Sequence, residues 1–195
     1  MVRRVLEKVR ERMMQPPKKA PSEKGETPGE DPKPIYSVKR HEDGVREFRV
    51  LGPHPTITQV VFDLVRELPN PMGVVLVEYG ESVRELVSST LERQQVTESL
   101  FRLRDLLGSP LMDLAVFSEA HGIEIFLDQF GLLEVRTGSW LEPRVVAMLE
   151  QLEFETVPEV TPPVGVLEAQ APSAEQASRL QWVILHLGLR KPAEG

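Results

Sequence analysis

Residues 112–138 have the sequence MDLAVFSEAHGIEIFLDQFGLLEVRTG, and this stretch decides the fold. Apolar residues recur in it with a period of two over three short runs, which is the pattern of β-strands. A loop over residues 119–122 separates the first two runs. Residues 129–131 separate the last two, and Gly131 suits the left-handed position of a three-residue hairpin loop. The stretch therefore predicts a three-strand antiparallel meander.

The loop lengths also predict which residues face each other across the meander. The three-residue loop pairs Leu127 with Leu133 and Ile125 with Val135, whereas a two-residue loop would mix polar and apolar side chains on each face. One face should therefore be apolar and buried. Its predicted members are Leu114, Val116, Ile123, Ile125, Leu127, Leu133 and Val135.

The opposite face carries carboxylates, and we expect it to be solvated, with Glu124 directly across from Arg136. A triad of Ser118, His121 and Asp128 can be written down. However, Ser118 belongs to the apolar face, and Asp128 lies at the far end of the hairpin. Because nucleophilic catalysis also needs an oriented base and an oxyanion site, we predict no catalytic residue here.

Apolar residues on this second face predict an interface. Phe117, Phe126 and Leu132 would together form a patch of the kind that marks a protein-binding surface. The alternative is that Trp140 or the C-terminal helix, which carries Trp182, covers the patch. The candidate interface residues are therefore these five.

The remaining periodicity predicts an α+β domain over residues 35–154 in the order β-α-β-α-β-β-β-α. We expect a single mixed sheet, with the meander at about 112–137, packed against three helices, plus a helix at each terminus. Strands are expected at residues 45–51 and 72–80. The helices are expected to follow capping boxes at Thr56 and Ser82, and the third to contain Pro143 in its first turn.

The segment VRELVSS, residues 83–89, fits a helix or a short strand, and we favour the helix. The order helix, strand, long helix, three-strand meander, helix resembles that of the roadblock/LC7 interaction domains. VRELVSS would then supply the second strand of that fold. The resemblance is one of element order, and it implies a module that binds other proteins.

Residues 1–14 are predicted to form a basic amphipathic helix, followed by a disordered, proline-rich linker over residues 15–34. Such a helix would dock on an anionic membrane surface or in a partner groove. The alternative is a charged terminal helix without a partner. The candidate docking residues are Arg3, Arg4, Val5, Val9, Arg12 and Met13.

Residues 155–172 are again proline-rich, and residues 173–189 predict a C-terminal helix with a capping box of Ser173 and Gln176. The second half of this helix is apolar nearly all round apart from His186, so we expect it to be buried. It would dock either on its own domain or on a partner.

The composition and charge of the chain favour some classes of binding partner over others. The chain has 195 residues, no cysteine and a net charge of −7. Residues 1–34 carry nine Lys/Arg and six Asp/Glu, whereas residues 35–195 carry fourteen and twenty-four. An acidic body argues against nucleic-acid binding and favours a basic protein partner. No run approaches the roughly 20 apolar residues of a membrane span, so we expect a cytoplasmic protein.

The sequence contains no P-loop, GxGxxG, GxSxG or HExxH motif, so it predicts no cofactor and no metal site. The leading hypothesis is a non-enzymatic protein-interaction module, an adaptor or regulator that could form a homodimer. One alternative is an immunity or antitoxin-like protein that neutralises a basic toxin. The other is a small enzyme without a recognisable motif.

Overall fold

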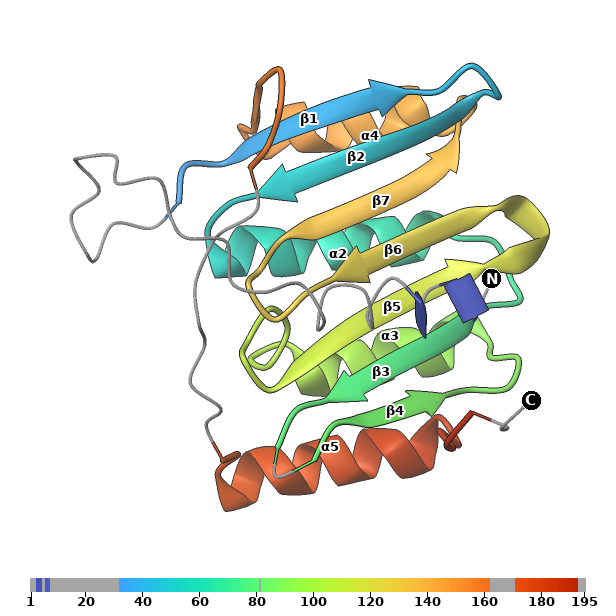
Figure 1. Ribbon diagram of the computed structural model, residues 1–195, viewed down its shortest axis with the longest axis vertical. Coiled ribbons are helices and arrows are strands. Elements are labelled where there is room, and N and C mark those ends of the chain that lie inside the picture. Colours follow the sequence, from blue (N-terminus) through green and yellow to red (C-terminus); the bar gives the residue numbers. More distant parts are fainter. Residues whose placement is uncertain (1–2, 5, 8–31, 81, 162–170, 193–195) are drawn as a thin grey trace.

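The computed structural model describes residues 3–4, 6–7, 32–80, 82–161 and 171–192. Within these residues, eight strands form a single mixed sheet in the order β4-β3-β5-β6-β7-β2-β1-β8 (Figure 1). The strands are β1 (Ile35–Arg40), β2 (Val45–Leu51), β3 (Gly73–Glu78), β4 (Arg84–Val87), β5 (Met112–Ser118), β6 (Ile123–Leu127), β7 (Leu133–Gly138) and β8 (Glu155–Thr156). All neighbours pair antiparallel except β1 and β8, which are parallel.

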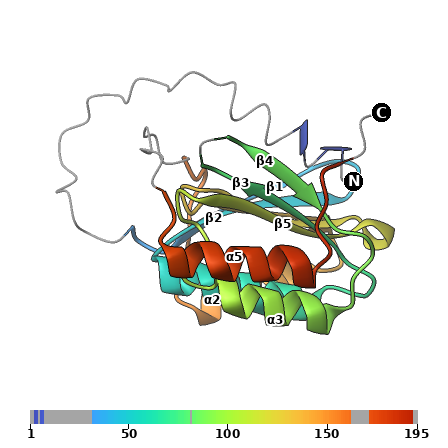
Figure 2. The ribbon, with the colours of Figure 1, turned by 90° about the horizontal axis from the view of Figure 1, so that it is seen from below.

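Four helices of the described residues cover one face of this sheet (Figure 2). They are α2 (His54–Glu67), α3 (Arg93–Leu103), α4 (Glu142–Gln151) and α5 (Ala174–His186). Helix α2 contacts both α4 and α3, and α3 contacts α5, so the layer runs α4-α2-α3-α5. The main apolar core lies between this layer and the sheet. The α+β fold class predicted from the sequence is confirmed.

The register predicted for the meander is confirmed. Leu127 lies opposite Leu133 and Ile125 opposite Val135, and Glu124 faces Arg136. All seven residues predicted for the apolar face belong to the core under the helices. The reason is geometric: side chains alternate along a strand, so one correct loop length sets the orientation of every residue that follows.

The preference for a helix over VRELVSS, residues 83–89, is wrong. Residues Arg84–Val87 form β4, which pairs with β3, and helix α3 begins only at Arg93. Strand β4 closes the free edge of β3, and this pairing outweighs the local helical periodicity. Strand β1, which the sequence pattern did not reveal, pairs with β2 along its whole length.

Two predictions of helix-capping residues, Thr56 and Ser82, also fail. Helix α2 begins at His54 with Pro55 in its first turn, and no side chain caps it. Ser82 precedes a strand, so it cannot cap a helix. By contrast, Ser173 accepts a hydrogen bond from the backbone of Gln176, as predicted, and Pro143 lies in the first turn of α4.

The second face of the sheet is buried, which corrects the expectation of a solvated face. Glu124 is 1% exposed, and Glu134, Asp113 and Asp128 are buried as well. Every residue of β5 and β6 is buried, whichever way its side chain points. The central strands are therefore covered on both sides.

The C-terminal helix docks on its own domain, which is one of the two alternatives considered. Leu180 and Val183 join the main core, and the backbone of Arg190 pairs with Val87 beyond the edge of β4. The expectation of a fully buried second half is wrong, because Leu185 is 71% exposed. Only the side of α5 that faces α3 and the sheet is covered.

A close approach between β3 and β5 gives a test of this packing. Gly73 lies opposite Phe117, and a Cβ atom on Gly73 would lie 2.2 Å from Cζ of the Phe117 ring. We predict that Gly73→Ala lowers the free energy of unfolding by about 1–3 kcal/mol, because the buried ring must move. Urea denaturation would measure the loss. Gly80→Ala is the control, since a Cβ there meets nothing within 4 Å. Equal stability of both variants would contradict the packing of Phe117.

Ion pairs join strands β1 and β2 to helix α4. Arg40 Nε donates to Glu142 Oε1 at 2.7 Å, and Arg46 donates to Oε2. The hydrogen bond from Arg46 lowers the pKa of Glu142 below its ordinary value of 4.5; with Arg40 it outweighs the opposing effect of burial. Glu142 therefore stabilises the fold at pH values above 4.5. The contribution is lost as the pH falls through the lowered pKa.

We predict that Glu142→Gln lowers the free energy of unfolding by about 1 kcal/mol near neutral pH, and that the difference from wild type disappears at low pH. Urea denaturation of both proteins across a pH series measures this difference. Glu150→Gln, an exposed position on the same helix, is the control and should change nothing. A difference independent of pH would refute the assignment of the stabilisation to these ion pairs.

Candidate functional site

The five residues predicted as an interface do not form one exposed patch. Phe117, Phe126 and Leu132 are buried inside the chain. Trp140 is exposed next to Gly138 at the end of β7, and Trp182 lies partly buried on α5. The sequence correctly placed Phe117 and Phe126 on the second face of the sheet, but it did not show that this face is covered.

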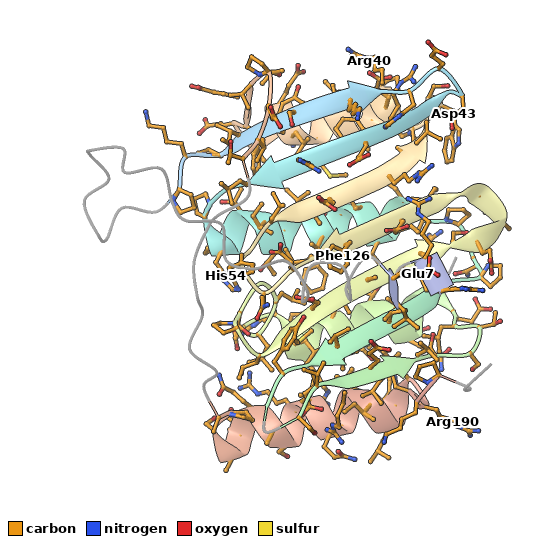
Figure 3. The ribbon with its side chains drawn as sticks, viewed as in Figure 1. Glu7, Arg40, Asp43, His54, Phe126 and Arg190 are labelled. Carbon is orange, nitrogen blue, oxygen red and sulfur yellow. The ribbon has the colours of Figure 1, made fainter. Side chains whose placement is uncertain are left out.

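Arg4 and Leu6, near the start of the chain, lie on this second face. Arg3, Arg4, Leu6 and Glu7 are helical, and Leu6 is buried in a cluster with apolar residues of the sheet. Those residues are Val75, Val77, Ala115, Phe117 and Phe126. A guanidinium nitrogen of Arg4 lies 3.7 Å from a carboxylate oxygen of Glu124. Phe126 and Glu7 lie on the same side of the sheet, away from the helices (Figure 3).

Two of the six predicted docking residues are described: Arg4 approaches Glu124 of the chain's own sheet, whereas the Arg3 side chain is exposed and pairs with Glu7. Val5, Val9, Arg12 and Met13 lie outside the described residues. A membrane surface or a partner groove as the target of this helix stays a prediction.

Of the serine, histidine and carboxylate considered as a triad, the first two meet, and the carboxylate lies apart from them. Ser118 Oγ lies 3.0 Å from His121 Nδ1 across a short 3₁₀ turn. Asp128 Oδ1 instead accepts the backbone N–H groups of Phe130 and Leu132 at 2.9 Å, in the turn between β6 and β7. Asp128 therefore holds a hairpin turn at the other end of β6.

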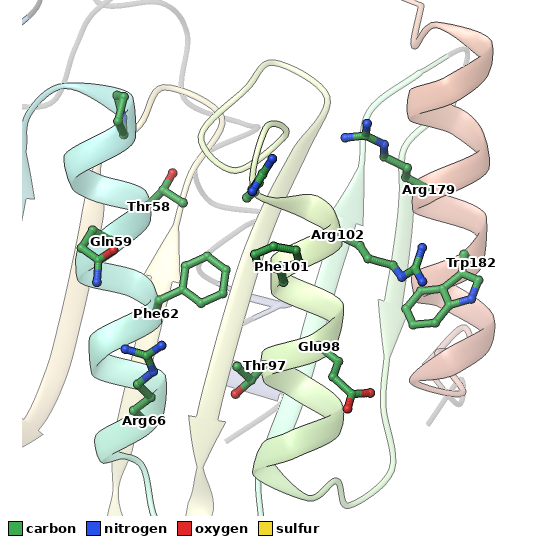
Figure 4. A pocket seen from close by; sticks show the side chains of 12 residues that line it. Thr58, Gln59, Phe62, Arg66, Thr97, Glu98, Phe101, Arg102, Arg179 and Trp182 are labelled. Atoms are coloured by element: carbon green, nitrogen blue, oxygen red, sulfur yellow. The ribbon is translucent and has the colours of Figure 1, made fainter.

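A groove on the outer surface of the helical layer is the strongest candidate site. It has a volume of about 950 Å³ and lies between α2, α3 and α5 (Figure 4). We call it the helix-layer groove. Its lining residues are Pro55, Thr58, Gln59, Phe62, Arg66, Thr97, Glu98, Phe101, Arg102, Arg104, Arg179 and Trp182.

Two phenylalanines face each other in this groove. Phe62 on α2 and Phe101 on α3 point toward one another (Figure 4), and Phe101 is 60% exposed. The buried stripe of α3 consists of Val96, Ser99, Leu100 and Leu103, so Phe101 lies outside it. A large aromatic side chain on the solvent side of an amphipathic helix contributes little to its own core. It is the kind of residue that a partner buries.

Arginine side chains line the groove beside these rings. The guanidinium carbon of Arg102 lies 4.1 Å from the ring centre of Trp182, and that of Arg104 lies 5.0 Å from the ring centre of Phe101. Trp182 also stacks on His186, with ring centres 4.3 Å apart. Cation–π contacts of this kind hold the charged groups close to the aromatic surface.

The arginines differ in how far they are already paired. Arg66 donates to Asp63 at 3.0 Å. Arg179 donates to Asp105 at 2.9 Å and also to Glu175, and these two carboxylates raise its pKa. Arg102 has no ion pair or hydrogen bond within the described part of the chain. It is therefore the guanidinium most available to a ligand.

One feature of the sequence does point to this groove: aromatic residues at positions outside the apolar stripes of the helices. Phe62 and Phe101 both fall outside the apolar stripes of their predicted helices, whereas Trp182 was among the candidate interface residues. Aromatic residues at positions predicted to face solvent would have pointed to the helical layer. Their meeting in one groove depends on how α2, α3 and α5 pack, which the pattern of a single helix cannot show.

The chain shows no significant match to any protein-family model, curated protein or solved structure. The fold itself is α+β, with one mixed sheet and a helical layer on one face. No helix in the described residues has the length and apolar character needed to cross a bilayer. The same residues contain no group of three or more His, Cys, Asp or Glu arranged to hold a metal ion.

The contact between Leu6 and the second sheet face can be tested by substitution. We predict that Leu6→Asp exposes the cluster around Phe117 and Phe126, because a buried carboxylate is strongly disfavoured among apolar side chains. Binding of a fluorescent dye that reports exposed apolar surface should rise. Arg3→Ala is the control, since the side chain of Arg3 is 92% exposed. If both variants bind dye equally, Leu6 does not cover the cluster.

Proposed function

We propose that this protein is a non-enzymatic protein-interaction module, an adaptor or regulator that binds its partner in the helix-layer groove. The observation that carries this proposal is the composition of the groove. Exposed Phe101, Phe62, Trp182 and several arginines are brought together there from three helices. Aromatic residues and arginine are enriched at the centres of protein interfaces, where they contribute most of the binding energy.

The rigidity of the surroundings supports the same proposal. Leu100 and Leu103 on the other side of α3 are fully buried, and Val60 and Val61 anchor α2 in the same core. Because both helices are anchored in the core, the backbone positions of Phe62 and Phe101 are fixed before a partner arrives. A preorganised backbone loses less entropy on binding.

The two alternatives drawn from the sequence have less support. An immunity-type protein for a basic toxin would present carboxylates, but arginines outnumber Glu98 in the described lining of the groove. An enzyme would bring reactive groups together, whereas Ser118 and Asp128 lie at opposite ends of β6. Neither alternative explains why Phe101 is exposed.

We predict that Phe101→Ser lowers the amount of partner captured from native lysate by about tenfold. Truncating a central aromatic residue typically costs more than 1 kcal/mol of binding free energy. The measurement is a quantitative pull-down with the full chain, read out by mass spectrometry. Thermal unfolding should be nearly unchanged, because the Phe101 side chain contributes little to the core.

Leu185→Ser is the matched control, because Leu185 is a large apolar residue on α5 that is as exposed as Phe101 but does not line the groove. It should retain the captured partner. Equal capture by wild type, Phe101→Ser and Leu185→Ser would place the interface elsewhere. Loss of capture in Leu185→Ser alone would move it to the outer side of α5.

A further inference from the structure

We propose that the helix-layer groove recognises a partner segment that carries a carboxylate close to a large apolar side chain. The apolar side chain would lie between Phe62 and Phe101, and the carboxylate would bind Arg102. This inference rests on the proposed function, since it names the chemistry of the partner at the same groove. It differs from the basic partner that the net charge alone predicts.

Arg102 contacts the aromatic face of Trp182. Its guanidinium lies over the face of the Trp182 ring, at 4.1 Å from the ring centre. Stacking uses the flat face of a guanidinium and leaves the N–H groups around its edge available. Those edges match the two oxygens of a carboxylate and form paired hydrogen bonds with it. The indole thus holds Arg102 in place without occupying its donors.

The described carboxylates near Arg102 make their contacts elsewhere. Glu98 lies one turn earlier on α3, but its carboxylate is 3.6 Å from Nε2 of His186. Asp105 is engaged by Arg179 at 2.9 Å. Asp105 thus has a cationic partner of its own, and the Glu98 carboxylate lies beside a histidine ring. In the described part of the chain Arg102 has only the aromatic contact. An incoming carboxylate meets a cation that no other anion holds.

Two other arginines that line the groove also favour a carboxylate on the partner. Arg66 pairs with Asp63, and Arg104 lies 3.4 Å from Asp105, in ion pairs whose arginine side chains are more than half exposed. Exposed pairs of this kind contribute little, so a partner carboxylate can replace them at small cost. A partner with lysines or arginines in this position would instead bring like charges together around Arg102.

The net charge of −7 does not oppose this local preference strongly. Charges more than about 8 Å apart are largely screened at physiological ionic strength. Recognition of the carboxylate would therefore depend on direct contact in the groove rather than on long-range attraction. The groove and the acidic remainder of the surface can then select different partners.

Phage display of random peptides of about 15 residues on the immobilised full chain tests the proposal. We expect wild type to enrich peptides with Asp or Glu within about four residues of a large apolar residue, the spacing of one helical turn. A selected peptide, measured by fluorescence anisotropy, should bind Arg102→Glu about tenfold more weakly or worse. Selection on Arg102→Glu should instead enrich Lys or Arg, which a merely structural role for Arg102 would not produce.

Lys191→Glu is the charge-matched control, because it makes the same change in net charge at an exposed position outside the groove. It should bind the selected acidic peptide as wild type does. Enrichment of basic or uncharged peptides by wild type would overturn the proposal, as would equal binding by Arg102→Glu. A labelled single-stranded oligonucleotide that binds wild type and is lost on Arg102→Glu would also overturn it, and would assign the groove to nucleic acid.

The two levels of inference remain distinguishable. If Phe101→Ser abolishes partner capture but wild type selects no acidic peptide, the groove is the interface and the chemistry proposed for its partner is wrong. If capture is also independent of Phe101, the proposed function of the groove fails as well. If wild type selects acidic peptides that Phe101→Ser and Arg102→Glu both lose, both proposals are supported.

Discussion

The two-sided burial of the central strands is the constraint on which the rest of the structure depends. Strands β5 and β6 bury every side chain, on the face toward the helices and on the opposite face. Apolar side chains on both faces of a sheet require a cover on both sides. Helices α2 to α5 provide one cover, and Leu6 belongs to the apolar cluster on the other side. Carboxylates such as Glu124 are buried as a consequence, with Arg4 brought close to them.

This arrangement determines which surface is left for binding. The central strands are covered on both faces, and Phe101 and Phe62 meet instead on the outer side of the helical layer. Phe101 lies there because α3 directs its stripe of Val96, Leu100 and Leu103 into the core and turns the opposite side outward. The packing of α5 against α3 then brings Trp182 beneath Arg102. The stability of the core and the chemistry of the groove thus come from opposite sides of the same helix.

Local sequence patterns predicted some features of the fold correctly and others wrongly. The register of the meander followed from the length of one hairpin loop, because side chains alternate strictly along strands. The stripe of α2 and the capping box of α5 were likewise local features. Strand β4 was missed, because VRELVSS satisfies both a helical and an extended pattern and only the free edge of β3 decides between them. The solvated face was predicted wrongly, because alternation shows which side chains share a face but not whether another segment covers it.

The sequence by itself therefore determined the meander, its pairing, the apolar stripes of the helices and the α+β class, since each depends on neighbours a few residues apart. Tertiary structure alone decided that β1 pairs with β2 and that β4 pairs with β3. It also decided the burial of the second face and the formation of the helix-layer groove. These features depend on contacts between segments that are distant in the chain. Arg102 and Trp182 are eighty positions apart, and no periodicity connects them. They meet because burying Leu180 and Val183 places α5 beside α3.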